Sequence, residues 1–209
     1  MVPLSDEEIV DKILHGETAL FEVLMRKYNE RLYRISLSIV GDGDAAEDIM
    51  QTAYINAYRQ LSNFEGRSGF GTWLTRILIN ESLLYKKREQ RKQQLVMETA
   101  FTEKHDETPL SGLLNKELKG ILEKAVASLP EKYRVVFVMR EVQGMSTDET
   151  MEALDLGESN VKMRLIRAKE MLRDNLQHLW SPRDIYEFNL IRCDRIVEKV
   201  MQNITAADR

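Results

Sequence analysis

Apolar residues recur at steps of three and four through most of the first hundred positions, a spacing typical of helix faces that pack on a core. Ser5 and Glu8 have the spacing of a capping box and Gly16 is a common helix stop, so a short first helix is predicted between them. A second helix is predicted over about 18–40. Its core stripe is expected to consist of Leu20, Phe21, Leu24, Tyr28, Leu32, Ile35 and Ile39.

Two more helices are predicted before residue 95. The run Gly-Asp-Gly at 41–43 should end the second helix, and Asp44 should cap the third. A loop over 62–71 then leads to a fourth helix that begins at about Thr72 and ends near Lys92. The core residues expected on the third helix are Ile49, Ala53, Tyr54, Ala57 and Leu61, and the fourth helix carries the apolar residues Trp73, Ile77 and Leu84 towards the basic run.

The helical pattern fades between 98 and 113, where acidic residues, a proline and a glycine favour a linker. It returns at Leu118, and a further helix is predicted from the Ser-Leu-Pro run at 128–130, with the proline in its first turn, to Gly144. Ser146 and Glu149 form a second capping box, which opens a short helix. The run Asp-Leu-Gly at 155–157 breaks this helix before a longer basic one over 158–176. This succession is the helix-turn-helix pattern.

The pattern as a whole predicts an all-α fold: two small helical domains joined by a flexible linker, with a C-terminal amphipathic helix. The expected divisions are a first domain over 1–95, an acidic linker over 96–114, a second domain over 115–179 and a helical extension over 180–209. The 10 glycines and 4 prolines are too few for a β-sandwich, which needs a turn signal every 8–12 residues or so.

Composition excludes several classes of protein. No apolar run approaches the roughly 18 residues that span a bilayer, and the first residues do not resemble a signal peptide, so we expect a cytoplasmic protein without membrane insertion. The single cysteine, Cys193, cannot form an internal disulfide and is expected to be a small buried hydrophobe, with redox sensing as the alternative. Histidines at 15, 105 and 178 are too scattered for a metal site, and no cofactor is expected.

The net charge of −4 conceals two opposite patches. Positions 85–92 hold five lysines and arginines against one glutamate, whereas 42–48 hold four acidic residues and no base. A basic patch suits phosphate groups, and an acidic patch repels them. The two faces are therefore expected to serve different partners.

The basic helix of the helix-turn-helix pattern has two distinct faces. At about 100° per residue, one side of this helix holds Val161, Leu165, Ala168 and Leu172. The opposite side holds basic residues and two apolar residues. Such a mixture suits a DNA major groove, although an ordinary solvated helix face has the same appearance. The candidate DNA-binding residues are Ser159, Asn160, Lys162, Met163, Arg164, Ile166 and Arg167.

A second candidate surface covers 64–80 and the basic run behind it. Aromatic residues beside arginines can stack bases and hold a single strand, as in proteins that bind single-stranded nucleic acid. Core packing is the alternative for the aromatics, and solubilising charge is the alternative for the basic run. The candidate residues are Asn63, Phe64, Arg67, Phe70, Thr72, Trp73, Arg76, Asn80, Lys86 and Lys87.

Two blocks of sequence resemble the extracytoplasmic-function (ECF) sigma factors of the sigma-70 family. The first block contains DAAEDIMQ at 44–51 and FEGRSGFGTWLTRI at 64–77, and it resembles their second conserved domain. The second contains SLPEKYR at 128–134, GMS at 144–146 and VKMRLIRAK at 161–169, and it resembles their fourth. The blocks occur in the family's order and together cover about 18–178.

The resemblance implies a transcription initiation factor that binds core RNA polymerase and directs it to promoters. The acidic third helix, with Glu47, Asp48, Gln51 and Tyr54, would dock on the coiled coil of the polymerase β′ subunit. The 61–69 loop and fourth helix would read and melt the −10 element of promoter DNA. The helix-turn-helix would read the −35 element while its domain sits on the β flap. An anti-sigma factor is an expected partner, and a compact free or inhibited form is expected.

Some residues depart from the family pattern. Met163, Thr147 and Thr150 differ from the residues common at their positions, so the −35 sequence cannot be transferred from relatives. One alternative is a stand-alone helix-turn-helix repressor or activator, which would use 146–173 alone and bind two half-sites as a dimer. An enzyme is the other alternative. It is disfavoured because the sequence contains no phosphate loop, nucleophile motif or convergent carboxylates.

Overall fold

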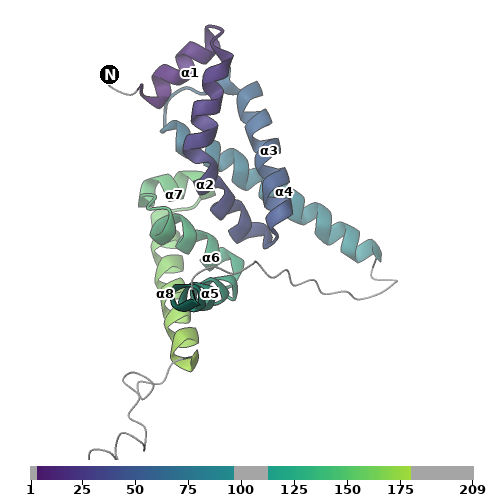
Figure 1. The fold of residues 1–209 in the computed structure, drawn as a ribbon, viewed down its shortest axis with the longest axis vertical. Coiled ribbons are helices and arrows are strands. Elements are labelled where there is room, and N and C mark those ends of the chain that lie inside the picture. The colour runs from purple at the N-terminus through teal and green to yellow at the C-terminus, as the bar shows by residue number, and fades with distance from the viewer. Residues whose placement is uncertain (1–3, 97–112, 180–209) are drawn as a thin grey trace, which may run out of the picture. The chain divides into compact units, whose positions relative to one another are not determined.

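The computed structural model describes residues 4–96 and 113–179, and every regular element within these ranges is helical (Figure 1). The predicted all-α fold is confirmed. The described residues up to Leu172 belong to one compact unit, and the chain from Arg173 onward is a separate unit of which only the end of one helix is described. The expected linker lies almost entirely outside the described residues, and the C-terminal extension with Cys193 lies wholly outside them.

The first two helices begin and end where local chemistry dictates. Ser5 caps α1 (Asp6–Leu14) in a complete capping box with Glu8, as predicted. A 3₁₀ turn (η1, Thr18–Leu20) leads into α2 (Phe21–Val40). Gly41 ends α2 with a φ of 76°, in the left-handed region that glycine adopts without a steric penalty. The predicted core stripe of α2 is buried, apart from its half-buried first residue, Leu20.

The cap of α3 (Gly43–Arg59) differs from the prediction. Asp42, not Asp44, is the N-cap: its Oδ1 accepts a hydrogen bond from the Ala45 backbone N–H at 2.7 Å. Asp44 lies in the first turn, where its negative charge interacts favourably with the positive end of the helix dipole. The five core residues predicted on and after this helix are all buried.

The fourth helix is longer than predicted. After a 3₁₀ turn (η2, Leu61–Asn63), α4 covers Phe70–Val96 and begins two residues before the expected start. Trp73 and Ile77 are half-buried and pack against the core, whereas Leu84 is exposed. The apolar side chains that α4 buries are Phe70, Leu74, Leu78 and Ile79.

A glycine permits this closer packing of α4 on α2. Gly71 lies under the Tyr28 ring, where an added Cβ would be 2.5 Å from a ring carbon. The small buried residues Thr75 and Ser82 continue the contact face, and the Ser82 hydroxyl lies 3.3 Å from that of Ser36 on α2. The apolar periodicity identifies large residues on helix faces, whereas the contact between α2 and α4 depends on small ones.

The second half of the described chain holds four α-helices and a π-helical turn. They are α5 (Leu113–Ala127), α6 (Glu131–Phe137), the turn η3 (Val138–Val142), α7 (Thr147–Leu154) and α8 (Glu158–Leu179). Pro130 is the N-cap of α6, one position before the first turn that was predicted for it. Gly144 has a φ of 65° and ends this segment, as expected.

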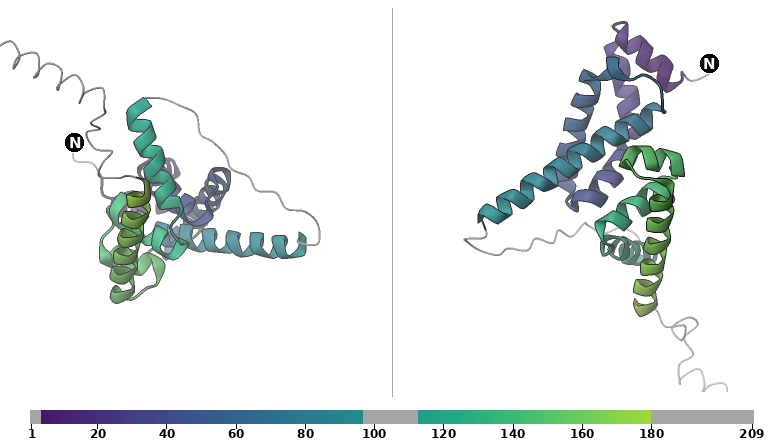
Figure 2. Two further views of the ribbon diagram at one scale, coloured as in Figure 1. Left: turned by 90° about the horizontal axis from the view of Figure 1, so that it is seen from below. Right: turned by 180° about the vertical axis from the view of Figure 1, so that it is seen from behind.

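The two halves share one apolar core. Val135, Val138, Met139, Met145 and Ala153 belong to the same cluster of buried side chains as the cores of α1 to α4. Within this unit α7 lies against α4, and α6 lies against α2 (Figure 2). The α4 helix is therefore packed between the first helices and the helix-turn-helix.

Candidate functional site

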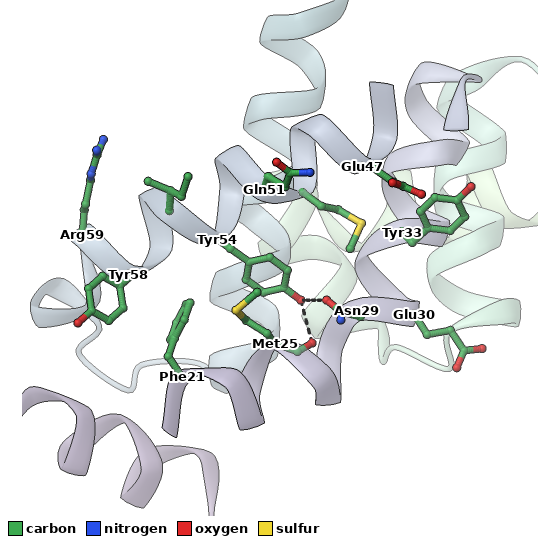
Figure 3. Close-up of a pocket in the computed structure, with 12 residues that line it drawn as sticks. Phe21, Met25, Asn29, Glu30, Tyr33, Glu47, Gln51, Tyr54, Tyr58 and Arg59 are labelled. Carbon is green, nitrogen blue, oxygen red and sulfur yellow. Dashed lines mark hydrogen bonds between the residues drawn. The ribbon is translucent and has the colours of Figure 1, made fainter. Parts of the chain in front are cut away.

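A groove opens on the surface between α2 and α3 and encloses about 810 Å³ (Figure 3). Its floor is made of aromatic, aliphatic and methionine side chains, and charged residues lie at its rim. A concave apolar surface with a polar rim is the usual form of a binding site. The lining residues are Phe21, Met25, Asn29, Glu30, Tyr33, Glu47, Met50, Gln51, Tyr54, Ile55, Tyr58 and Arg59.

Tyr54 holds the floor of this groove in place. Its hydroxyl lies 2.9 Å from the Asn29 side-chain oxygen and 3.1 Å from the Met25 carbonyl, so it ties α3 to α2 (Figure 3). The ring of Phe21 packs edge-on against Tyr54 and Tyr58, with centroids 6.2 and 5.1 Å apart. Burial raises the pKa of the Tyr54 hydroxyl, which therefore stays protonated and able to donate.

The structure brings together three of the four residues proposed for polymerase binding. Glu47, Gln51 and Tyr54 line the groove, whereas Asp48 is exposed on α3 outside the lining. Tyr54 is 5% exposed, so it supports the groove more than it offers a surface. The sequence reasoning missed Ile55 and Tyr58, although an apolar residue outside the core stripe of a helix is the signal that identifies them.

The helix-turn-helix is built by local capping. The Ser146 hydroxyl accepts from the Glu149 N–H at 3.1 Å, and the Glu149 carboxylate accepts from the Ser146 N–H at 2.6 Å. The predicted capping box is therefore present, and its backbone hydrogen bond is the main reason that the pKa of Glu149 is lowered. Asp155 ends α7 with a φ of 53°, and α8 begins three residues later.

The outer face of α8 is as the sequence predicted. Val161, Ala168 and Leu172 are buried and Leu165 is half-buried, while Met163 and Ile166 are 56% and 52% exposed. Two cations of this face are held by carboxylates of the same helix. Arg167 Nη1 lies 2.9 Å from Glu170 Oε2, and Lys162 Nζ lies 2.6 Å from Glu158 Oε1. Ser159 and Asn160 are also exposed, and Arg164 is half-buried.

The candidate −10 residues divide into an exposed set and a packed set. Phe70 is fully buried against Tyr28, Phe64 and Trp73, and Thr72 is 2% exposed. The DNA contacts expected of Phe70 and Thr72 are therefore not available in this conformation. Phe64, Trp73 and Lys86 are half-buried. The exposed candidates are Asn63, Arg67, Arg76, Asn80 and Lys87.

In the described part of the chain, the histidine, cysteine, aspartate and glutamate side chains form no group that could hold a metal ion. The helices of this part include none that is both long and apolar enough to cross a bilayer.

Comparison with known proteins identifies the family. Residues 24–92 match Sigma-70 region 2, and residues 119–172 match Sigma-70, region 4. The RNA polymerase sigma-H factor of Pseudomonas aeruginosa is 31% identical over 183 residues, which cover 83% of this chain and 95% of that protein. The ECF RNA polymerase sigma-E factor of Escherichia coli (strain K12) is 30% identical over 185 residues, covering 84% of this chain and 96% of that protein.

A solved structure shows the same fold. It is the sigma factor RpoE from Bartonella quintana, co-crystallised with the anti-sigma factor NepR. Its TM-score is 0.64 at 22% sequence identity, and the match covers 75% of this chain and 96% of that one. From the family matches and the sequence relatives, the chain belongs to the sigma-70 family of RNA polymerase sigma factors, in its ECF group.

Proposed function

We propose that this chain binds core RNA polymerase and directs it to specific promoters by recognising their −10 and −35 elements and promoting DNA melting. It works in the cytoplasm, performs no catalysis of its own and needs no cofactor. Polymerase binding and −10 recognition belong to 1–95, and −35 recognition belongs to 115–179. The observation that carries the proposal is the outer face of α8, because basic residues and two exposed apolar side chains lie there, opposite the buried Val161, Ala168 and Leu172.

The outer face of α8 suits the major groove of the −35 element. An arginine can donate two hydrogen bonds to one guanine, and an apolar side chain can contact the thymine methyl group. Met163 and Ile166 are each more than half exposed without any described partner to cover them, and Arg167 lies beside Ile166 in the sequence. Ser159 and Asn160 lie in the first turn of α8, where backbone N–H groups favour a phosphate.

The groove between α2 and α3 suits a helical segment of the polymerase, for which the coiled coil of the β′ subunit is the proposed partner. Ile55 and Tyr58 provide exposed apolar area, and Glu47 adds a carboxylate at the rim. Such a combination favours an amphipathic helix with apolar anchors and a basic flank. Asp48 is exposed one residue further along α3 and extends the acidic rim.

An anti-sigma factor is the proposed regulator. The similar sigma factor from Bartonella quintana was co-crystallised with one, NepR. A partner that covered the α2–α3 groove would exclude the polymerase from it. The groove supports this regulation because its floor is apolar and open to a competing helix.

Reconstitution with purified core polymerase tests the function. We expect transcript starts to share −10 and −35 sequences when the chain is added, and no such starts with core polymerase alone. Free chain should bind the same promoters only weakly at physiological salt, since its net charge is −4. Nanomolar, sequence-specific binding by the chain alone would contradict the proposal and would indicate a stand-alone regulator.

A further inference from the structure

Asp6, at the start of α1, is tied to α2 through both oxygens of its carboxylate. Its Oδ2 accepts a hydrogen bond from the Tyr28 hydroxyl at 2.5 Å, and its Oδ1 lies 2.6 Å from Lys27 Nζ. Only 13% of the Asp6 side chain is exposed, and the capping box of Ser5 with Glu8 fixes the turn that carries it. A charged acceptor held in this way makes a short, strong hydrogen bond, so Asp6 keeps the Tyr28 hydroxyl in one place.

The Tyr28 ring lies between Asp6 and the first turn of α4. Tyr28 is 7% exposed; burial raises the pKa of its hydroxyl and the hydrogen bond to Asp6 raises it further, so the hydroxyl stays protonated and able to donate. A Cβ added at Gly71 would lie 2.5 Å from the ring carbon Cε1 and 2.9 Å from the hydroxyl oxygen. The hydroxyl that Asp6 holds is therefore the part of the ring that lies against the Gly71 backbone. Any displacement of this hydroxyl alters the contact with the first turn of α4.

Tyr28 also packs on an aromatic cluster made of Phe64, Phe70 and Trp73. The ring centroids of Tyr28 and Phe70 are 5.8 Å apart, and Phe70 lies 5.6 Å from Phe64 and 5.7 Å from Trp73. The Phe64 and Trp73 rings, 5.4 Å apart, are half-buried candidate −10 residues, whereas Phe70 is fully buried. Rings in such contact prefer particular mutual orientations, and a close-packed interior transmits small shifts. The orientation of Tyr28 therefore affects both candidate rings through Phe70.

We propose that Asp6 and Tyr28 are positioning residues for promoter melting: their hydrogen bond sets the aromatic cluster in the orientation that captures an unstacked base of the −10 element. A base gains more from stacking on rings that are already ordered, because binding then does not have to order them. The α1 helix carries none of the candidate DNA-binding residues and contributes to melting through this contact. The consequence for promoters rests on the proposed function, whereas the effect of Asp6 on Trp73 is a property of the free chain.

Fluorescence of Trp73 in the free chain tests the positioning. Trp180→Phe leaves Trp73 as the single tryptophan. In this background Tyr28→Phe removes the hydroxyl and keeps the ring, so Trp73 emission should shift to longer wavelength and acrylamide should quench it more strongly. Asp6→Ala should give the same change, and the double variant should add nothing to it, because both residues act through one hydrogen bond. Asp6→Asn keeps an oxygen that accepts from Tyr28, so its emission should lie closer to that of the parent than the emission of Asp6→Ala.

Tyr133→Phe and Asp11→Ala are the matched controls. Tyr133→Phe removes the same hydroxyl on α6, where the ring centroid lies 4.9 Å from Lys132 Nζ. Asp11→Ala removes the same charge from α1, at an exposed carboxylate 3.5 Å from His15 Nδ1. Both controls should leave Trp73 emission unchanged, and circular dichroism shows that each variant is folded. Parental Trp73 emission in folded Tyr28→Phe and Asp6→Ala, or a double variant that adds the two changes, would overturn the positioning role.

The rate of promoter opening tests the consequence for function. With core polymerase, Tyr28→Phe should open a duplex promoter about tenfold more slowly, the ratio that corresponds to one hydrogen bond to a charged group. Its affinity for core polymerase and its −35 preference should stay parental, since neither surface contains Tyr28. A changed Trp73 emission with a parental opening rate, or an equal loss of polymerase affinity, would overturn the role in melting. Absence of opening with the parent chain would instead contradict the proposed function, and the Trp73 measurement on the free chain would still decide the positioning.

Discussion

Arg167→Ala tests which part of α8 reads the bases. Arg167 shares the outer face with Met163 and Ile166, so a helix lying in the major groove places it at the base edges. A bidentate arginine–base contact is worth about 1–3 kcal/mol of discrimination. Arg167 must leave Glu170 to make it, and an exposed pair within one helix costs about 0.5 kcal/mol to break. The net loss should therefore be about 0.5–2.5 kcal/mol, or about 2- to 70-fold in sequence preference.

Transcription from a library of −35 variants measures this preference. Arg167→Ala should flatten it at one or two positions. Lys162→Ala should weaken binding to all sequences alike and lower the salt dependence by about one ion, because Lys162 stands at the edge of the face towards the phosphates. Glu170→Gln is the control: it releases Arg167 and should leave the preference in place. An Arg167→Ala protein that folds and keeps the parental preference would refute the assignment of this face.

Two further predictions concern the groove and the capping box. Ile55→Asp should weaken binding to core polymerase at least about tenfold in a titration, since it removes about 1.5–3 kcal/mol of apolar burial. Leu14 on α1 is equally exposed, and Leu14→Asp should leave the affinity for polymerase unchanged. Equal losses of affinity in the two variants would argue against the groove. The lowered pKa of Glu149 means that its stabilisation is complete above the unfolded pKa and is lost as pH falls through the folded pKa. Urea unfolding should give Glu149→Gln a lower free energy of unfolding than the parent at pH 7, and this difference should shrink below about pH 4. Glu152→Gln is the charge control. A difference in unfolding free energy that does not change with pH would refute the role of the Glu149 carboxylate.

Local chemistry explains which helix ends could be predicted. Both capping boxes, Ser5 with Glu8 and Ser146 with Glu149, are present because their hydrogen bonds join residues three apart and need no other part of the fold. The cap of α3 was assigned to the wrong aspartate. Either Asp42 or Asp44 can accept from a first-turn N–H, and Gly43, with no side-chain preference of its own, adopted the helical position.

Positions that depend on where a neighbouring helix ends could not be predicted. Leu84 continues the apolar period of α4, but it is 44% exposed. The helix extends to Val96, and the buried positions of its described side chains end at Ser82. Periodicity indicates a helix and its apolar face, but it does not indicate where the surface that packs against this face ends. The ion pair between Lys86 of α4 and Glu131 of α6 could not be predicted from the sequence for the same reason.

The candidate cations for DNA give a physical reason to expect that this acidic chain binds promoters only weakly without polymerase. Lys86, Lys162, Arg167 and Arg67 each form an ion pair with a carboxylate of this same chain. DNA binding must exchange each pair for a phosphate or a base, which reduces the gain per contact and keeps free-state affinity low. Attachment to polymerase supplies the missing affinity because it turns promoter contact into an intramolecular step at high effective concentration. The ion pairs within the chain therefore favour promoter binding that depends on polymerase.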